Sequence, residues 1–338
     1  MTRSAAPLVV GVVGVLGAGL GWLLEPARFA HAWLGAFSAW LEWPLGSLAL
    51  LMVHALTGGR WGEAIRPALL CGIATLPLVV PGLLPLAATF HVLYPWARPD
   101  ADVANAFYLN VPFFAGRFVV YLIVWFGLSA LVFGAVRHGR AVARFAAPGL
   151  LLLAVTATFA AIDTTLSLSP DFNSSEWGMI AAAGAGLLAL SVATLMTAPM
   201  ADSVVVADLG RLLLGLVVLW AYLDFMQFLI VWESDLAPGA AWYVQRSSHG
   251  WGLVVILIGL GHFLLPMAML ILPAVRRSRR AIMLVAAWLV LMEIVHAEWL
   301  VLPAGGGLSW IDLFPLLAFG GFGVALAQRT PQRVPAHV

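Results

Sequence analysis

The sequence predicts an all-α integral membrane protein with about ten transmembrane helices, and three observations support this fold class. First, 62% of the 338 residues are hydrophobic and only 10% are charged, whereas soluble domains average about 45–50% and 25%. Second, the apolar residues form continuous runs long enough to cross about 30 Å of hydrocarbon. Third, no series of alternating segments of about ten residues is present, which argues against an outer-membrane barrel.

This composition excludes several classes of protein. A soluble enzyme, a disordered chain and a nucleic-acid-binding protein are inconsistent with so few charged residues and a net charge of +1. The single cysteine, Cys71, excludes an intrachain disulfide and a set of cysteine ligands. The chain alone therefore cannot hold an iron–sulfur cluster.

The ten predicted spans are apolar runs that end at charges or turn residues. They cover residues 5–24, 33–56, 67–93, 112–136, 145–168, 177–198, 208–233, 250–272, 281–302 and 309–327. The first span follows Arg3 and resembles a signal peptide, but its apolar run is long and further hydrophobic helices follow at once. We therefore interpret it as a retained span. The third span contains Pro77, Pro81 and Pro85, which should kink it.

The connections between the spans differ in character. The two longest loops, 94–111 and 234–249, follow the third and seventh spans. Turns rich in arginine, 137–144 and 276–280, end the fourth and eighth spans. Between the ninth and tenth spans the three glycines 305–307 lack a phosphate-binding pattern and are predicted to form a turn.

The placement of arginine predicts the orientation in the membrane. All 17 basic residues are arginine, and 13 of them lie on the side that holds the N-terminus. The other four are Arg28, Arg98, Arg117 and Arg246. Because positively charged residues are retained on the cytoplasmic side, both termini are expected in the cytoplasm.

The sequence also contains an apparent internal repeat. The loop after the third span, with Tyr94-Pro95-Trp96 and Tyr108, resembles the loop after the seventh, with Trp232 and Tyr243. The spacing along the sequence between the matching residues of the two loops is consistent with a duplicated four-helix unit. The two copies would form parallel bundles. We therefore divide the chain into a first helix and its loop, two bundles, and a last helix with its tail, at residues 1–32, 33–170, 171–303 and 304–338. The alternative is that any two membrane hairpins share aromatic loop ends and basic turns.

A few ionisable side chains lie inside the predicted spans, where a charge is costly unless it faces protein or water. They are Glu42, Asp163, Asp224, His262, Glu293, His296 and Glu298. Glu42, Asp224 and Glu293 are predicted at one depth, about nine residues from the outer ends. Asp224 and His262 are predicted to pair near the midplane. Glu293 and His296 share a helix face, whereas Glu298 is rotated away from them.

Acidic residues and histidines at one depth favour a hydrated proton path, because their pKa values can be tuned toward neutral pH. The alternative is a set of polar contacts that only fixes helix register. His91, Arg117 and Asp163, near the outer ends, are candidates to hydrogen-bond a quinone carbonyl. His262 and His296 are a less favoured pair of haem ligands, because no helix carries the paired histidines of a two-haem bundle.

Several loop and helix-end motifs resemble the ActF membrane subunit of bacterial alternative complex III. The motifs are Leu51–Gly62, Leu93–Ala97, Tyr108–Phe114 with Arg117, Gln227–Trp232, Trp242-Tyr243, Gly250–Gly252 and His262–Pro266. The resemblance runs from about residue 35 to 303. It implies the NrfD/PsrC type of fold, with two four-helix bundles flanked by outer helices.

The resemblance also implies a function and partners. A protein of this kind lies in the bacterial inner membrane, in a complex that oxidises quinol and passes electrons to a periplasmic cytochrome or a terminal oxidase. The partners would be an ActC-like membrane subunit, a multihaem cytochrome and an iron–sulfur subunit, with lipids around them. Haem and iron–sulfur clusters would belong to those partners, and this chain would serve as a scaffold and candidate proton path without a redox cofactor of its own. The alternatives are a quinone-binding membrane anchor and an independent secondary transporter, which the parallel repeat alone would favour.

Overall fold

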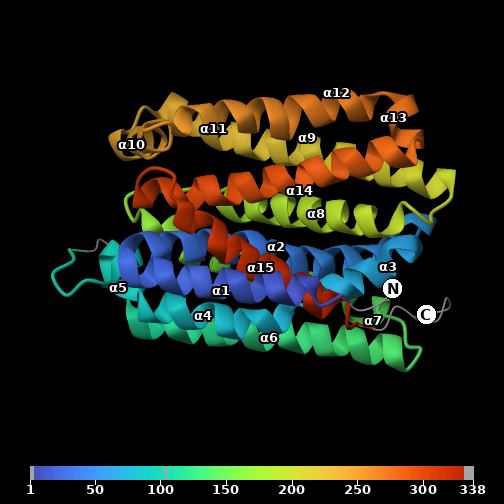
Figure 1. Ribbon diagram of the computed structural model, residues 1–338, viewed down its shortest axis with the longest axis horizontal. Helices are drawn as coiled ribbons and strands as arrows, with labels where there is room; N and C mark the ends of the chain where they lie inside the picture. Colours follow the sequence, from blue (N-terminus) through green and yellow to red (C-terminus); the bar gives the residue numbers. More distant parts are fainter. Residues whose placement is uncertain (1–3, 103–104, 331–338) are drawn as a thin grey trace.

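The computed structural model describes residues 4–102 and 105–330, and almost all of this chain is helical. The long helices run side by side, and α1 begins and α15 ends at the same end of the bundle (Figure 1). Within the described residues, ten helices are long and apolar enough to cross a membrane. The predicted all-α membrane fold with ten spans is therefore confirmed.

The helices of the first half are α1 (Ala6–Leu24), α2 (Pro26–Thr57), α3 (Arg60–Ile73), α4 (Val79–Ala88), α5 (Phe90–Leu93), α6 (Val111–Arg137) and α7 (Ala143–Thr164). Those of the second half are α8 (Trp177–Thr197), α9 (Ser203–Ser234), α10 (Ala237–Gln245), α11 (Trp251–Leu257), α12 (Leu265–Ile271), α13 (Pro273–Arg277), α14 (Arg279–Val301) and α15 (Leu313–Ala327). A π-helical segment, Ile258–Leu264, joins α11 to α12. Short 3-10 turns lie at Leu76–Leu78, Pro95–Ala97, Leu166–Leu168, Leu302–Gly305 and Trp310–Asp312.

Three helices begin five or more residues earlier than the hydrophobic pattern predicts: α2, α3 and α9. Only Glu25 separates α1 from α2, and α2 begins at Pro26, because proline suits the first turn of a helix. The predicted division at residues 32 and 33 therefore lies inside α2. The third span begins at Arg60 and is broken by a turn and a 3-10 segment before α4. Of the three predicted prolines, Pro77 lies in this break, and Pro81 and Pro85 lie within α4.

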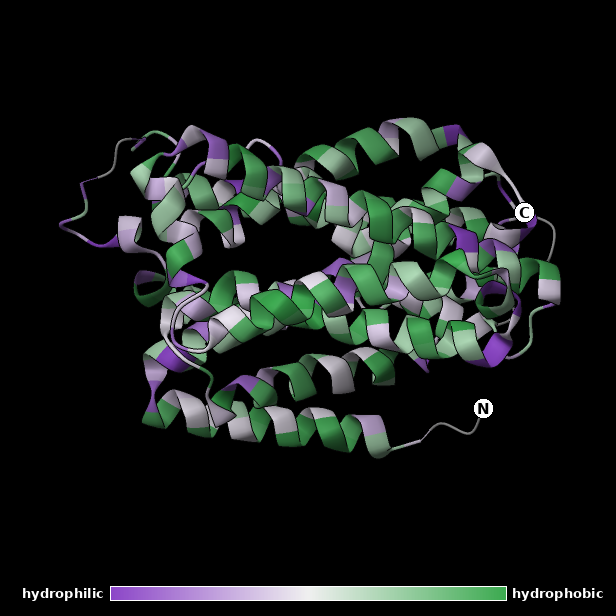
Figure 2. Cartoon of the chain, turned by 90° about the horizontal axis from the view of Figure 1, so that it is seen from above, coloured by the Kyte–Doolittle hydropathy of each residue, from purple (hydrophilic) through white to green (hydrophobic). Residues whose placement is uncertain are grey.

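The bundle has two distinct ends. The Arg-rich end holds the connections 58–59, 138–142, 198–202 and 272–278, and the aromatic end holds the connections 94–110 and 235–250. Hydrophilic residues gather mainly at these two ends and hydrophobic ones along the helices (Figure 2). At the Arg-rich end Arg60 and Asp202 form an exposed ion pair of 2.5 Å that joins α3 to the start of α9.

The centre of the bundle is the contact between α2 and α8. A side chain at Gly46 of α2 would overlap the carbonyl of Ala185 on α8, so glycine permits this close approach. Around this contact, α2 packs against α3, α7 and α14, whereas α8 packs against α9, α14 and α7. These matching partners are those that a duplicated four-helix unit would give, and the duplication itself stays a prediction.

The first and last helices pack against each other on the outside of this core. Any side chain at Gly14 of α1 would overlap the Ala318 backbone of α15, and one at Gly321 would overlap the Gly11 backbone. Small residues thus let the two backbones touch, which is how helices associate in hydrocarbon. Arg28 and Asp312 form a buried ion pair that also ties α2 to the start of α15.

We expect Gly14→Ile to destabilise the docking of α1 on α15, because the new side chain must push the backbones apart. The expected loss is about 1–3 kcal/mol of unfolding free energy, the usual cost of overpacking. Thermal unfolding of the purified chain in detergent measures it. Gly19→Ile is the matched control, because Gly19 is also on α1 and faces open space; equal losses in both variants would contradict the proposed packing.

Candidate functional site

A string of four ionisable side chains crosses the middle of the second half of the chain. Nε2 of His262 lies 2.9 Å from Oε2 of Glu293, and Nδ1 of His296 lies 3.8 Å from Oε1 of the same glutamate. Nε2 of His296 lies 3.5 Å from Oδ1 of Asp224. Three of the four side chains are buried, whereas Asp224 is 31% exposed. The string therefore runs from a buried histidine to a partly open carboxylate.

The helices that carry these groups explain their positions. Glu293 and His296 are three residues apart on α14 and so share one face. His262 lies in the π-helical segment, where Leu265 N–H donates to the Leu260 carbonyl and Pro266 has no N–H to offer. The Gly261 carbonyl accepts instead from the Trp288 indole at 2.7 Å. A side chain of α14 thus stabilises the distorted turn that presents His262.

Two further side chains complete the surroundings of the string. The Trp220 indole of α9 lies 3.8 Å from the His262 ring and 4.9 Å from the His296 ring, measured between centroids. A Cβ at Gly184 of α8 would overlap Oε1 of Glu293 and lie 3.7 Å from Oε1 of Glu42. Glu42 and Glu293 therefore border the same glycine. We call Glu42, Asp224, His262, Glu293 and His296 the buried cluster.

Many polar atoms of the buried cluster have no hydrogen-bond partner among the residues that the structure describes. These are both ring nitrogens of His262, both carboxylate oxygens of Glu293, Nε2 of His296 and Oε2 of Glu42. The His262–Glu293 distance is that of an ion pair, but the ring N–H does not point along it as a hydrogen bond requires. Buried polar atoms are ordinarily satisfied, by protein or by ordered water. The buried cluster thus has the hydrogen-bonding capacity to bind water.

A cavity of about 300 Å³ reaches the buried cluster. Glu42, Asp224, Glu293 and His296 line it, together with residues near the aromatic end such as Gln227. A second cavity, of about 520 Å³, lies between α9 and the α11 region and is lined mostly by apolar and aromatic side chains. Asp224, Tyr243 and Trp299 line both cavities.

The structure corrects one predicted pairing and places the other candidates. The expected pair of Asp224 with His262 is wrong, because His262 faces Glu293 and Asp224 faces His296. The predicted common face of Glu293 and His296 is confirmed, and Glu42 lies with them. Glu298 is buried against Gly35 of α2, away from that face, as predicted.

Asp163 is not part of the buried cluster, because it pairs with Arg117. Nε and Nη2 of Arg117 donate to its two oxygens at 2.9 and 2.8 Å, and the Tyr121 hydroxyl donates to it at 2.8 Å. Nη1 of Arg117 donates to the Tyr108 carbonyl at 2.9 Å. The guanidinium also lies 3.9 Å from the Tyr108 ring and 4.5 Å from the Phe113 ring. Each guanidinium nitrogen of Arg117 and each carboxylate oxygen of Asp163 therefore has a hydrogen-bond partner within the protein.

The quinone site predicted at His91, Arg117 and Asp163 stays a prediction. Arg117 and Asp163 pair with each other, and this pair uses both carboxylate oxygens and two of the guanidinium nitrogens. His91 is exposed, and its Nδ1 lies 2.8 Å from the Ala97 carbonyl, in the loop that follows α5. These contacts favour a structural role for the three residues.

The two histidines of the buried cluster do not fit a haem. Their Nε2 atoms, which would bind iron, face the carboxylates of Glu293 and Asp224. The Trp220 indole lies against both rings and takes the space of a porphyrin. The polar interpretation of these histidines is thus better supported than the haem alternative.

Sequence reasoning missed several residues around the site. Trp220 is four residues before Asp224, so its helical spacing would have placed it on the same face. Arg246 was expected in an outer loop, but its side chain is fully buried. Its guanidinium stacks 3.7 Å from the Trp242 ring and donates to the Leu300 carbonyl at 2.8 Å. Burial lowers the pKa of Arg246 to about 9, which leaves it charged at neutral pH.

Comparison with known proteins gives no match: no family model matches the chain, and no curated protein is significantly similar to it.

We expect Asp163→Ala to destabilise the protein strongly, because it leaves the buried Arg117 charge without a partner. Removing one member of a buried ion pair costs about 3–5 kcal/mol. Thermal unfolding in detergent measures the loss. Asp208→Ala is the matched control, because Asp208 pairs with Arg211 on the exposed surface of α9 and such pairs contribute about 1 kcal/mol or less. Similar losses in the two variants would show that the Arg117 pair is not structural.

Proposed function

We propose that this chain is a membrane subunit of a quinol-oxidising redox complex and that its buried cluster transfers protons. The observation that carries the proton role is the string from His262 through Glu293 and His296 to Asp224. Imidazole and carboxylate groups alternate along it. Each neighbour can therefore accept a proton that the previous group releases, as in proton relays of pumps and transporters.

The geometry of the buried cluster supports a role in proton transfer rather than a purely structural role. A contact that only fixes helix register would use its donors and acceptors fully, as Arg117 and Asp163 do. The buried cluster instead keeps unpartnered atoms beside a cavity. Water in that cavity would bridge the contacts of 3.5 and 3.8 Å, which are too long for direct hydrogen bonds.

The redox setting rests on the resemblance to the ActF subunit. This resemblance implies a bacterial inner membrane and, as partners, an ActC-like subunit, a multihaem cytochrome and an iron–sulfur protein. The excess of arginine at one end supports cytoplasmic termini. In this setting the chain contributes the membrane scaffold and the proton path, while electron transfer takes place in its partners.

A second candidate function is a quinone-binding anchor, and the cavity of about 520 Å³ favours it. Tyr222, Phe225 and Phe228 line this cavity and are more than a third exposed on the bundle surface, so an amphipathic ring could enter from the lipid. Asp224 and Tyr243 would meet its polar groups. Photolabelling with an azidoquinone tests this: labelled peptides from α9 would support it, and labelling confined to a partner subunit would count against it.

The proton role predicts that Asp224→Asn lowers the number of protons moved per electron, because an amide cannot carry a proton across this step. We expect a loss of most of the coupled proton movement while quinol oxidation continues. The measurement uses the complex purified in mild detergent and reconstituted into liposomes with an internal pH dye. Asp208→Asn is the control, because Asp208 lies on the same helix, is equally exposed and pairs with Arg211 at the surface.

The same preparation tests the redox setting. Co-purification of a multihaem cytochrome and an iron–sulfur protein is expected. A chain that is purified intact and alone would contradict the complex and favour an independent transporter. Unchanged coupling in Asp224→Asn, in a complex that assembles, would contradict the proton role and leave only a structural one.

A further inference from the structure

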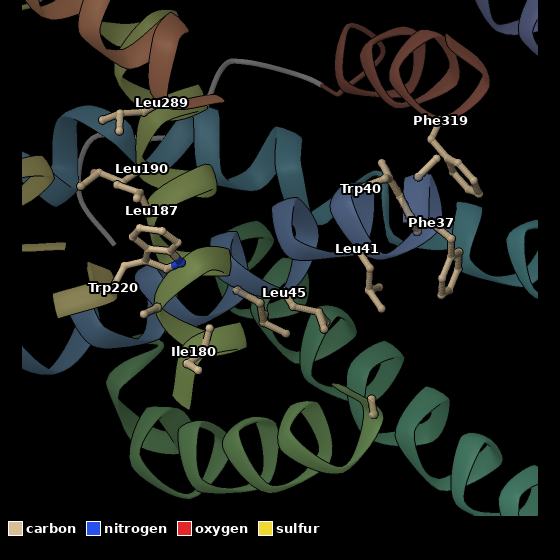
Figure 3. Close-up of a cluster of buried hydrophobic side chains, with 14 of the residues drawn as sticks. Phe37, Trp40, Leu41, Leu45, Ile180, Leu187, Leu190, Trp220, Leu289 and Phe319 are labelled. Carbon is tan, nitrogen blue, oxygen red and sulfur yellow. The ribbon is translucent and has the colours of Figure 1, made fainter. Parts of the chain in front are cut away.

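Fully buried apolar side chains close the buried cluster on the side of the Arg-rich end. Each of four helices that carry or border the cluster contributes one: Leu48 of α2, Leu187 of α8, Val217 of α9 and Leu289 of α14, each 0–1% exposed. Leu187, Leu190 and Leu289 appear with Trp220 in one group of core side chains (Figure 3). Leu48, Leu187, Val217 and Leu289 belong to one cluster of buried apolar side chains, and we call these four the apolar layer.

This layer lies about one helical turn from the buried cluster. Leu289 precedes Glu293 by four residues on α14, and Leu187 follows Gly184 by three residues on α8. Since α14 runs away from the Arg-rich end and α8 runs toward it, both leucines lie on the Arg-rich side of Glu293. At the helical rise the separation is about 5–6 Å.

Beyond the layer on α8 lie two further polar atoms, the hydroxyls of Ser191 and Thr194. Both side chains are fully buried, and neither has a hydrogen-bond partner among the described residues. Ser191 is seven residues after Gly184 and so lies on the same face of α8, one turn past Leu187. Thr194 lies within one turn of the end of α8. We call these two residues the hydroxyl group.

Several other helix hydroxyls in this chain behave differently. Ser129, Thr156 and Thr164 each donate to the carbonyl four residues before them, at 2.7–2.8 Å. Such back-bonding is the usual way in which serine and threonine are satisfied inside a helix. The hydroxyl group lacks it, as does Ser38 beside the cavity, and its polar atoms therefore remain available to water.

The cavity at the buried cluster does not reach the hydroxyl group. Its polar lining residues, such as Ser38, Thr165 and Gln227, lie level with the buried cluster or toward the aromatic end. The part of the cavity that extends along α7 toward the Arg-rich end is lined by leucine and alanine, such as Leu150 and Ala154. Two polar regions are thus separated by one apolar layer.

We propose that Leu187 and Leu289 form a hydrophobic gate between the buried cluster and the hydroxyl group. This inference rests on the proposed proton role of the buried cluster. A narrow apolar constriction excludes water, and protons cannot cross it without water or a titratable group. With the gate closed, the buried cluster exchanges protons only with the aromatic end. Opening would require α8 and α14 to separate locally.

The test measures the passive proton permeability of the full chain in liposomes. Vesicles with an internal pH dye receive a potassium diffusion potential through valinomycin, which drives protons inward. Vesicles that contain the wild-type chain should be no more permeable to protons than empty vesicles. Leu289→Ser and Leu187→Ser, which place hydroxyls in the layer from two different helices, should each raise proton entry about tenfold, equivalent to lowering the barrier by about 1.4 kcal/mol.

Two comparisons make the test specific. Leu284→Ser is the matched control on α14, because Leu284 is 70% exposed and faces away from the layer. Adding Glu293→Gln to Leu289→Ser should return proton entry toward the wild-type level, since the open route leads through the buried cluster. Size-exclusion chromatography and helical content confirm that each variant is folded.

The outcomes separate this inference from the proposed function. Unchanged permeability in either serine variant that folds would overturn the gate, and so would a leak that Glu293→Gln does not reduce. These results come from the chain alone and need neither quinol nor partner subunits. The proposed function would instead be contradicted by unchanged proton coupling in Asp224→Asn, or by a chain that is purified without redox partners.

Discussion

The cost of leaving a polar group without a partner in hydrocarbon governs this structure. No water is available inside the bilayer to compensate such a group, so each one must be satisfied within the protein or face a hydrated space. Arg117 with Asp163, and Arg28 with Asp312, form buried ion pairs in the protein interior. Glu293 and His262 are satisfied only in part, and a cavity lies beside their cluster. This contrast distinguishes charged groups with a structural role from those that are candidates for proton transfer.

In each half of the chain a buried contact between a nitrogen-bearing side chain and a carboxylate joins two helices, but the side chains differ. In the first half a buried ion pair joins the fourth and fifth spans, Arg117 of α6 with Asp163 of α7. In the second half His262 and Glu293 join the eighth and ninth spans. The first junction holds a guanidinium, whose N–H groups form a fixed fork, and the second holds an imidazole, which offers one donor or acceptor at each ring nitrogen.

The sequence was sufficient to predict the helices and the depth of the acidic residues. It was not sufficient to predict which side chains these residues contact. Apolar length sets the spans, and the spacing of Glu293 and His296 sets their common face. The partner of Asp224 depends on how far α9, the π-helical segment and α14 rotate toward one another, and hydropathy carries no information on that rotation. The π-helical segment itself depends on Pro266 and on a distant indole, Trp288. Likewise, Arg246 appears in the sequence as a loop residue, and only packing with Trp242 buries it.

The packing of α1 on α15 has a consequence for how the protein is made. The glycine face of α1 packs against a helix that ends at Ala327, so its main partner is synthesised about 300 residues later. Until α15 is inserted, the described neighbour of α1 is α2, to which Glu25 joins it directly. The packing of α1 is thus completed by α15, and a chain truncated before Asp312 would leave both α1 and the buried Arg28 charge without these partners. Quality control in the membrane could recognise an unfinished chain by that feature alone.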